Sequence, residues 1–268
     1  MKRKLKKGRL IVPFLLIIIL VVAFILIKNN DNKDTKGKNK QIQSDTEVAK
    51  DTKDISYNLR NGEEIAGKSK TDKIITKYNG AYYVEGVMIV NKTYPLDSSY
   101  VPQNPYKEIT SDYLYGGDYI EKEVMTAFMK MQNDASKLGY NLHISSGYRS
   151  YQVQVDLYNN YASRDGIDKA DTYSARAGYS EHQSGLCFDL NGTNGNFLET
   201  ETGKWVNENA YKYGFILRFP KNKENYTGYN YEAWHFRYVG IELATILYNN
   251  SDWISLEEYL GIDSKYDS

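Results

Sequence analysis

The feature that most constrains this chain is an apolar run close to its N-terminus. Leu10 to Ile27 contains no charged side chain, and it follows the strongly basic segment 1–9. As a helix, such a run is just long enough to cross a bilayer core of about 30 Å. Basic flanks stay on the cytoplasmic side, so the rest of the chain is expected on the extracellular side. We therefore predict a cytoplasmic tail at 1–9 and a single transmembrane anchor at 10–27.

A cleaved signal peptide is the alternative explanation of this run. Its apolar part exceeds the 7–15 residues typical of such peptides, and the polar segment 28–33 offers no small-residue cleavage site. The sequence favours a retained anchor, with cleavage left open.

Residues 28–73 are rich in Lys, Asp, Asn, Thr and Ser and contain few apolar residues. A segment of this composition buries too little apolar surface to offset the entropy of ordering it. We predict a disordered spacer at 28–73 and one domain at 74–268, which at roughly 190 residues has an ordinary size.

Charge and cysteine content exclude some classes of protein. The 34 basic and 34 acidic residues give a formal net charge of zero, so no basic field indicates binding to nucleic acid. A single cysteine excludes an internal disulfide. The oligomeric state is not indicated.

Two short segments carry the residues of a possible metal site. They are Ser180 to Asp189 and Glu232 to His235, and they hold two of the three histidines in the chain. His182, Asp189 and His235 offer two imidazoles and a carboxylate, the kind of three-ligand set that a catalytic zinc uses. Glu232 is a spare carboxylate that could take a proton from the attacking water.

Each of these residues alone is more often an ordinary surface or core residue, so the hypothesis rests on their combination. His182 and Asp189 lie seven residues apart, whereas a zincin helix places its histidines four apart. An extended strand of that length would separate them too far, at about 3.3 Å per residue. The chain must therefore bend near Gly185, which a glycine permits, with Asp189 near the end of the strand that follows.

At these residues the chain resembles the zinc D,D-carboxypeptidases of the VanY type and their L,D-carboxypeptidase relatives. Their pattern Ser-x-His-x-x-Gly-x-Ala-x-Asp, then Glu-x-Trp-His, is matched at Ser180, His182, Gly185, Asp189, Glu232, Trp234 and His235. Further matches lie at 146–150, Gln152, 209–216 and 236–240. The resemblance extends roughly from Tyr83 to Leu260.

The resemblance implies that His182, Asp189 and His235 bind one zinc ion and that Glu232 is the general base. It also implies that Arg149, Gln152 and Ser180 contact substrate, with the Arg149 guanidinium helping to neutralise charge on the substrate carbonyl oxygen. From the residues alone, Arg149 reads instead as an exposed charge before a helix that Ser150 caps.

Two positions depart from the family pattern. Cys187 stands where relatives usually have Ala, and its apolar neighbours Leu186 and Phe188 predict a buried structural residue and disfavour a nucleophile or ligand. Ala233 stands where relatives usually have Pro, which removes no catalytic group. The third histidine, His143, is interpreted as structural or as a residue that supports a ligand from behind.

Periodicity then predicts the surrounding elements. Apolar residues from Val124 to Leu138 fall at helical spacing after a capping box at Asp118 and Glu121, with a stop at Gly139. We further expect a strand or hairpin segment at 84–92 and strands at 140–146, 186–189, 215–219 and 234–238. Helices are expected at 150–164, 202–213, 241–248 and 256–260, and a polar loop at 165–179. Helices and strands do not alternate regularly, so we predict a single α+β domain with a mixed, mainly antiparallel sheet and flanking helices.

The function expected from the resemblance is removal of the C-terminal D-alanine from peptidoglycan stem peptides. It leaves the choice between D,D- and L,D-carboxypeptidase open, and an anchored domain disfavours a dipeptidase acting on a cytoplasmic dipeptide. The rival hypothesis is a non-catalytic wall-binding module that kept the fold. The expected partners are stem peptides, and the membrane through the anchor.

Overall fold

The structure is a computed structural model that describes residues 58–108, 115–116 and 118–267. The predicted cytoplasmic tail, the anchor at 10–27 and most of the spacer fall outside these residues. Within the described part of the chain, none of the helices has both the length and the apolar character needed to cross a bilayer.

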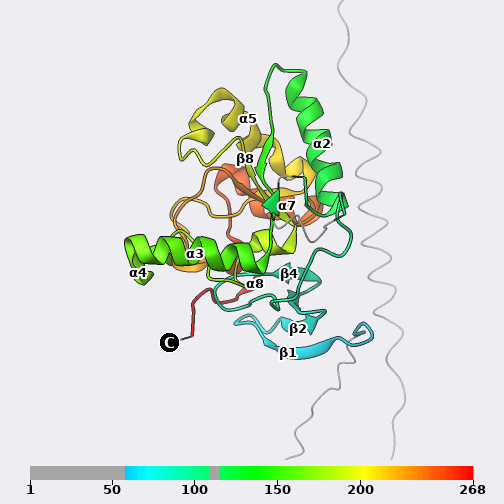
Figure 1. Cartoon of the computed structure of the whole chain (residues 1–268). Coiled ribbons are helices and arrows are strands. Elements are labelled where there is room, and N and C mark those ends of the chain that lie inside the picture. Colours follow the sequence, from blue (N-terminus) through cyan, green and yellow to red (C-terminus); the bar gives the residue numbers. More distant parts are fainter. Residues whose placement is uncertain (1–57, 109–114, 117, 268) are drawn as a thin grey trace, which may run out of the picture. The chain divides into compact units, whose positions relative to one another are not determined.

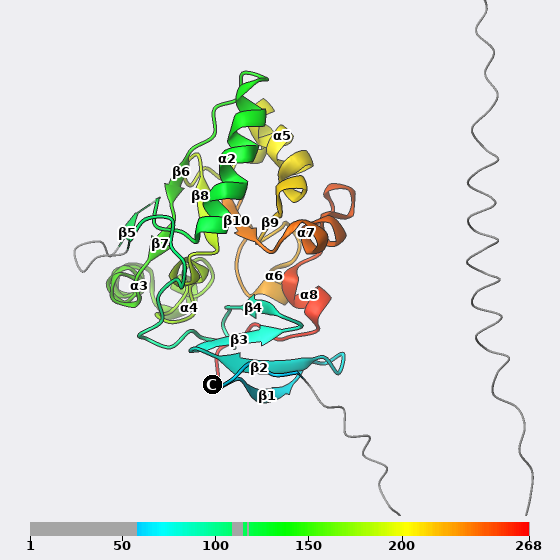
Figure 2. The ribbon, with the colours of Figure 1, turned by 90° about the vertical axis from the view of Figure 1, so that its right-hand side faces the viewer.

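The described chain begins with an antiparallel meander of four strands, which lies at one end of the domain (Figures 1 and 2). The strands are β1 (Glu64–Lys68), β2 (Ile74–Tyr78), β3 (Ala81–Val84) and β4 (Val87–Ile89). The two tight turns, Asn79-Gly80 and Glu85-Gly86, have positive φ at both positions. Such turns match the twist of the flanking strands and join them as hairpins.

The meander corrects the expected boundary of the spacer, because β1 lies within the range 28–73. Its side chains are mostly exposed, and Ile65 retains 51% exposure. β1 is held by its backbone pairing to β2. A strand without a buried face carries no alternation of apolar and polar residues, which is why composition alone assigned it to the spacer.

A second four-stranded sheet forms the centre of the domain, in the order β6-β8-β10-β9. Its strands are β6 (Ile144–Ser146), β8 (Cys187–Leu190), β9 (Phe215–Leu217) and β10 (His235–Tyr238). A short ribbon pairs β5 (Tyr115–Gly116) with β7 (Tyr148–Arg149). Every strand pair in the described residues is antiparallel, so the α+β prediction is confirmed, with three sheets in place of one.

Helices flank the central sheet (Figure 2). The α-helices are α2 (Lys122–Ser136), α3 (Tyr151–Asp165), α4 (Ile167–Ala170), α5 (Glu201–Asn209), α6 (Glu224–Thr227), α7 (Ile241–Tyr248) and α8 (Leu256–Leu260). Single 3₁₀ turns are η1 (Glu181–Ser184), η2 (Phe197–Glu199), η3 (Ala210–Tyr213) and η4 (Asn249–Ser251).

The main core lies between α2 and the central sheet. Val124, Phe128 and Met131 of α2 are buried, and the Phe128 ring packs edge-on against Phe188 of β8 at 5.2 Å between centroids. Burial of each such side chain contributes roughly 1.5–3 kcal/mol. This packing holds rigid the strand that carries Asp189.

The helix predicted from Val124 onward is confirmed, but its predicted cap is wrong. The N-cap of α2 is Glu121, whose carboxylate accepts the N–H groups of Gln103 and Asn104 from the preceding loop. At the other end, Gly139 has φ 84 and ends the helix as expected. Leu138 lies beyond the last turn and is 59% exposed, so it does not belong to the core stripe.

Candidate active site

Strand β8, which carries Asp189, begins after a sharp bend in the chain. His182 lies in η1, and Gly185 ends this turn in the left-handed conformation at φ 70. Asp189 then lies in β8, directly opposite His235 of β10 in the strand register. The predicted bend at Gly185 is thus confirmed, and together with the antiparallel pairing it brings the three predicted ligands together.

The distances between the ligand atoms fit a single metal ion. Asp189 Oδ1 lies 3.5 Å from His182 Nε2 and 3.3 Å from His235 Nδ1. Nitrogen and oxygen ligands bound tetrahedrally to zinc, with bonds near 2.0–2.2 Å, stand about 3.4 Å apart. The two distances from Asp189 therefore match the spacing between neighbouring ligands of one zinc ion.

The environment of Asp189 also fits a cation. Its Oδ1 atom is buried and has no hydrogen-bond partner among the described residues. A buried oxygen of this kind is costly unless a cation or donor faces it. Burial alone would raise the pKa of Asp189, but His182 and His235 outweigh it and hold that pKa well below its usual value. The His182 Nδ1 atom donates to the Gly147 carbonyl oxygen at 2.6 Å, which leaves Nε2 to face the site.

Glu232 lies beside the ligands in the segment that leads into β10. Its Oε2 atom is 3.5 Å from His235 Nδ1, and its side chain is only 14% exposed. Burial raises the pKa of Glu232 to about 7, although the neighbouring His235 opposes the shift. A carboxyl group with a pKa near neutrality can both accept a proton and return it.

Cys187 is closer to this cluster than its sequence context indicated. The prediction of burial is confirmed, since the residue has no exposed surface. However, the thiol and the two histidines each offer a ligand atom within 4.8 Å of the others. Burial raises the pKa of Cys187, but the two imidazoles outweigh it and bring the value to about 7. The two-residue period of a strand places residues 187 and 189 on one face, and this signal could have revealed the proximity.

Arg149 faces the same cavity from the end of β7. Its Nη1 atom donates to Gln154 Oε1 at 2.7 Å, and Gln154 Nε2 donates to the Ala175 carbonyl oxygen at 2.6 Å. Ser150 caps α3 as predicted by accepting the Val153 N–H. Arg149 is therefore a positioned, half-buried cation, and its interpretation as an exposed charge is wrong.

Gln152 is not part of this arrangement. It is on the exposed side of α3, where its amide donates to Asp156 at 3.3 Å. Gln154 is 1% exposed and holds Arg149. Two residues along a helix correspond to a rotation of about 200°, so the two glutamines point in nearly opposite directions.

A cavity of about 420 Å³ opens over the cluster. Its floor holds the predicted ligands, Glu232 and Ser180. Its walls come largely from tyrosines of α3, of the 165–179 loop and of the segment before β10: Tyr161, Tyr173, Tyr179, Tyr229 and Tyr231. The segment 165–179, which was predicted as a polar loop, contributes Tyr173 and Tyr179 to this wall and also contains the short helix α4.

His143 lies away from the cluster. It is exposed before β6, and its backbone pairs with Asn191. The interpretation that it supports a ligand is wrong. The residue that contacts the outer nitrogen of His235 is Glu181, which pairs with Arg218 and Arg237. The sequence did not indicate this group, because residues far apart in the chain share no local pattern.

Comparison with known proteins agrees with this geometry. Residues 117–241 match the family model described as VanY, D-alanyl-D-alanine carboxypeptidase. YodJ of Bacillus subtilis (strain 168), which its name describes only as a candidate carboxypeptidase, is 37% identical over 90% of this chain and 91% of its own length.

Two solved structures are also similar. The LdcB LD-carboxypeptidase, whose structure is described as revealing the basis of peptidoglycan recognition, is 40% identical with a TM-score of 0.59, covering 70% of this chain and 95% of that one. A mutant of the D,D-pentapeptidase VanY from a VanB-type vancomycin resistance cassette, in complex with Zn(II), is 32% identical with a TM-score of 0.54, covering 64% of this chain and 97% of that one. Site geometry, family match and near full-length similarity agree, and the chain belongs to the VanY family of D-alanyl-D-alanine carboxypeptidases.

Proposed function

We propose that this protein is a zinc-dependent carboxypeptidase that removes the C-terminal D-alanine from peptidoglycan stem peptides. The observation that carries the proposal is the convergence of His182, Asp189 and His235 around one point, with Glu232 beside them. A wall-binding module that had lost its activity would be free to lose the base or a ligand, and this chain keeps all four.

One zinc ion per chain would be held by His182 Nε2, Asp189 Oδ1 and His235 Nδ1. When bound, zinc would act as a Lewis acid on the scissile carbonyl group and make water more acidic. The solved VanY relative in complex with Zn(II) supports this choice of metal.

The residues of the chain then supply binding and proton transfer. The Arg149 guanidinium, held by Gln154, is placed to attract the negative charge that develops on the carbonyl oxygen or the carboxylate of the substrate. Glu232 takes a proton from the attacking water and delivers it to the departing amine. Ser180 and the tyrosines of the cavity wall would contact the rest of the peptide.

The two solved relatives are named for different linkages, one as an LD-carboxypeptidase and one as a D,D-pentapeptidase. The proposal covers both, because both cleavages release D-alanine with the same metal, base and cation. The linkage preference depends on the cavity wall.

We also propose that the apolar run at 10–27 anchors the chain and places the domain on the cell-wall side of the membrane. The basic flank at 1–9 supports this orientation. In intact cells without a wall, added protease should degrade the domain. A domain that is protected until the cells are lysed would contradict the proposal.

The function is tested by incubating purified protein with a defined pentapeptide, a tetrapeptide and the dipeptide D-alanyl-D-alanine, with products identified by mass. Loss of one D-alanine from the pentapeptide indicates D,D activity, and loss from the tetrapeptide indicates L,D activity. The control is His182→Ala, which should release none. A wild-type protein that binds wall fragments, contains no zinc and releases no D-alanine would support the wall-binding alternative.

A further inference from the structure

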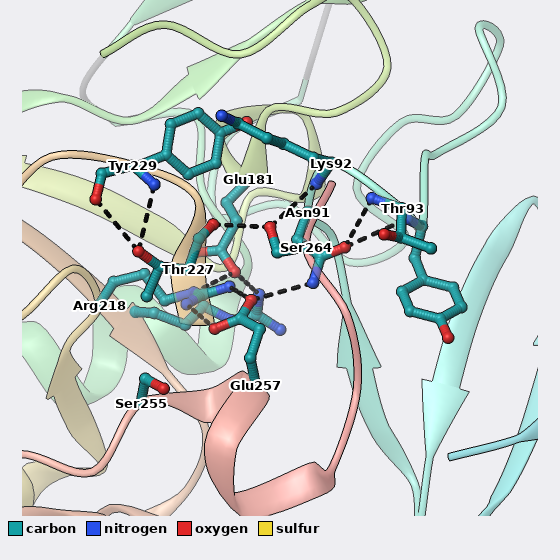
Figure 3. Close-up of polar contacts among 12 residues, drawn as sticks. Asn91, Lys92, Thr93, Glu181, Arg218, Thr227, Tyr229, Ser255, Glu257 and Ser264 are labelled. Atoms are coloured by element: carbon teal, nitrogen blue, oxygen red, sulfur yellow. Dashed lines mark hydrogen bonds and ion pairs between the residues drawn. The ribbon is translucent and has the colours of Figure 1, made fainter. Parts of the chain in front are cut away.

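Glu181 is a buried carboxylate that the proposed reaction does not use. It lies between Ser180 and His182 in η1, and it is 4% exposed. Its Oε1 atom accepts two charge-assisted hydrogen bonds, from Arg218 Nε at 2.8 Å and from Arg237 Nη1 at 2.7 Å (Figure 3 shows Glu181 with Arg218).

The arginines are themselves fixed by further buried partners. Arg218 makes a bidentate pair with Glu257 of α8, at 2.8 and 2.6 Å, and Glu257 accepts from Asn91 at 3.0 Å (Figure 3). Arg237 donates to the carbonyl oxygens of Met88 and Tyr238. Two carboxylates thus balance two guanidinium groups, and the bidentate geometry restricts how far Glu181 can move.

The second carboxylate oxygen of Glu181 points at a metal ligand. Its Oε2 atom lies 3.5 Å from His235 Nε2, and neither buried atom has a hydrogen-bond partner among the described residues. The opposite ring nitrogen, His235 Nδ1, faces Asp189 and Glu232. A neutral imidazole carries its proton on one nitrogen only, so the group that faces Nε2 decides whether Nδ1 has a free lone pair.

We propose that Glu181 is a positioning residue for His235, and that it holds the tautomer with the proton on Nε2 so that Nδ1 is free to bind the metal. The inference rests on the proposed zinc site and goes beyond it by assigning the choice of ligand nitrogen. Histidine ligands commonly donate their other ring N–H to such a carboxylate, and loss of that partner typically weakens metal binding by 10- to 100-fold.

The substitution that separates positioning from packing is Glu181→Gln. Glutamine has the same shape but only one accepting oxygen. That oxygen would accept the hydrogen bonds from Arg218 and Arg237. The amide NH₂ would then face His235 Nε2 and require that nitrogen to accept a hydrogen bond. The ring proton would move to Nδ1, where it blocks the metal.

Glu181→Asp is the matched comparison, because it is shorter but keeps two accepting oxygens. If Glu181 positions His235, zinc affinity should follow the order wild type, then Asp, then Gln, with Gln weakened by 10- to 100-fold. If Glu181 only fills space, the shorter Asp variant should bind zinc more weakly than the Gln variant. A reversed order or equal affinities would overturn the inference.

The measurement uses the purified full-length chain in detergent. Zinc affinity is determined by competition with a chromophoric chelator, and the visible spectrum of the Co²⁺-substituted protein reports the ligand set, which the Gln variant should alter. The control is Leu247→Ala in α7, a fully buried position outside the cluster that should lower stability but leave zinc affinity and spectrum unchanged. If the Gln variant does not fold, the comparison is between Glu181→Asp and Leu247→Ala. Glu181→Asp should then bind zinc more weakly, and equal zinc affinities would overturn the inference.

The wild-type protein separates this inference from the proposed function. A wild type that binds no zinc would contradict both. If the wild type binds zinc and releases D-alanine but the zinc affinities of the Asp and Gln variants do not follow the expected order, only the role of Glu181 is contradicted.

Discussion

Asp189 and Glu232 carry the same functional group but have opposite environments. Asp189 faces two imidazoles, which lower its pKa below the usual value although burial opposes them. Burial dominates at Glu232 and raises its pKa to about 7. This difference agrees with the proposed roles, metal ligand for the first carboxylate and proton transfer for the second.

Replacement of Glu232 by Gln should separate chemistry from metal binding. The amide cannot accept the proton, so we expect D-alanine release to fall by roughly 10²- to 10⁴-fold. Zinc content measured by elemental analysis should stay at the wild-type level, because the three ligands are unchanged. A zinc-free Gln variant would show instead that Glu232 is a ligand.

At the residue scale, the candidate metal ligands and base could be named from the sequence, because each lies in a short motif, and the structure brings these residues together. Gln154 and Glu181 could not. Each acts through a partner that only the folded chain brings close, Arg149 in one case and His235 in the other.

Among the elements, the turn between η1 and β8 sets the separation of two ligands. Gly185 has φ 70, and a Cβ atom there would lie 2.7 Å from Pro102 Cγ and 3.1 Å from Pro102 Cβ. The position therefore requires glycine for both its backbone conformation and its contact with the neighbouring loop.

Gly185→Ala should reduce both stability and zinc affinity. The left-handed conformation costs about 1–2 kcal/mol for a residue with a Cβ, and the clash adds roughly 1–3 kcal/mol. Chemical denaturation gives the loss of stability. The matched control is Gly192→Ala, where φ is 83 but no atom lies within 4 Å of the added Cβ. Equal losses at the two positions would show that the contact with Pro102 costs nothing.

The cavity wall formed by the 165–179 loop is held by an ion pair. Asp171 accepts hydrogen bonds from Arg176 Nη2 at 2.8 Å and from Tyr158 Oη at 2.6 Å. Burial would raise the pKa of Asp171, but the hydrogen bonds of Arg176 and Tyr158 outweigh it and lower the net value.

A lowered folded-state pKa means that Asp171 stabilises the protein above its unfolded-state pKa of about 3.9. This stabilisation should be lost as the pH falls through the folded-state value. When the pH is lowered from 7 to 3, the melting temperature should therefore fall less steeply for Asp171→Asn than for the wild type. Asp168→Asn, at an exposed position of α4, is the control and should melt in parallel with wild type. Identical slopes for wild type and Asp171→Asn would exclude this role.

At the element scale, most helices and strands were predicted where their apolar spacing is regular. The helices α3, α7 and α8 and the strands that carry the site lie close to their expected ranges. The failures include β1, which has no buried face, and α4, which lies within the range predicted as a polar loop. They also include the capping box of α2, because Glu121 instead accepts hydrogen bonds from the preceding loop.

At the scale of the whole molecule, the metal should contribute to folding. His182, Asp189 and His235 are each at most 5% exposed, so removal of the cation leaves buried polar groups facing one another. A ligand that binds only the folded state stabilises it by about 4 kcal/mol at a thousandfold excess over its dissociation constant.

Chelation with EDTA should therefore lower the melting temperature of the wild-type protein, and added zinc should restore it. His182→Ala lacks a ligand and should melt at a temperature that changes little with chelator. A wild-type melting temperature that is insensitive to EDTA, in protein shown to have lost its zinc, would contradict the expected coupling.

The sequence by itself determined the fold class and the bend at Gly185, and its short motifs named the candidate metal ligands and base, because these depend on local periodicity and on residues close together in the chain. Only the tertiary structure decided which side chains support them. The antiparallel pairing of β8 with β10 set the distance between Asp189 and His235. The tertiary fold also brought Cys187 beside the histidines and linked Glu181 of η1 through Arg218 to Glu257 of α8. The physical reason is that such contacts join residues far apart in the chain, whose proximity leaves no periodic trace in the sequence.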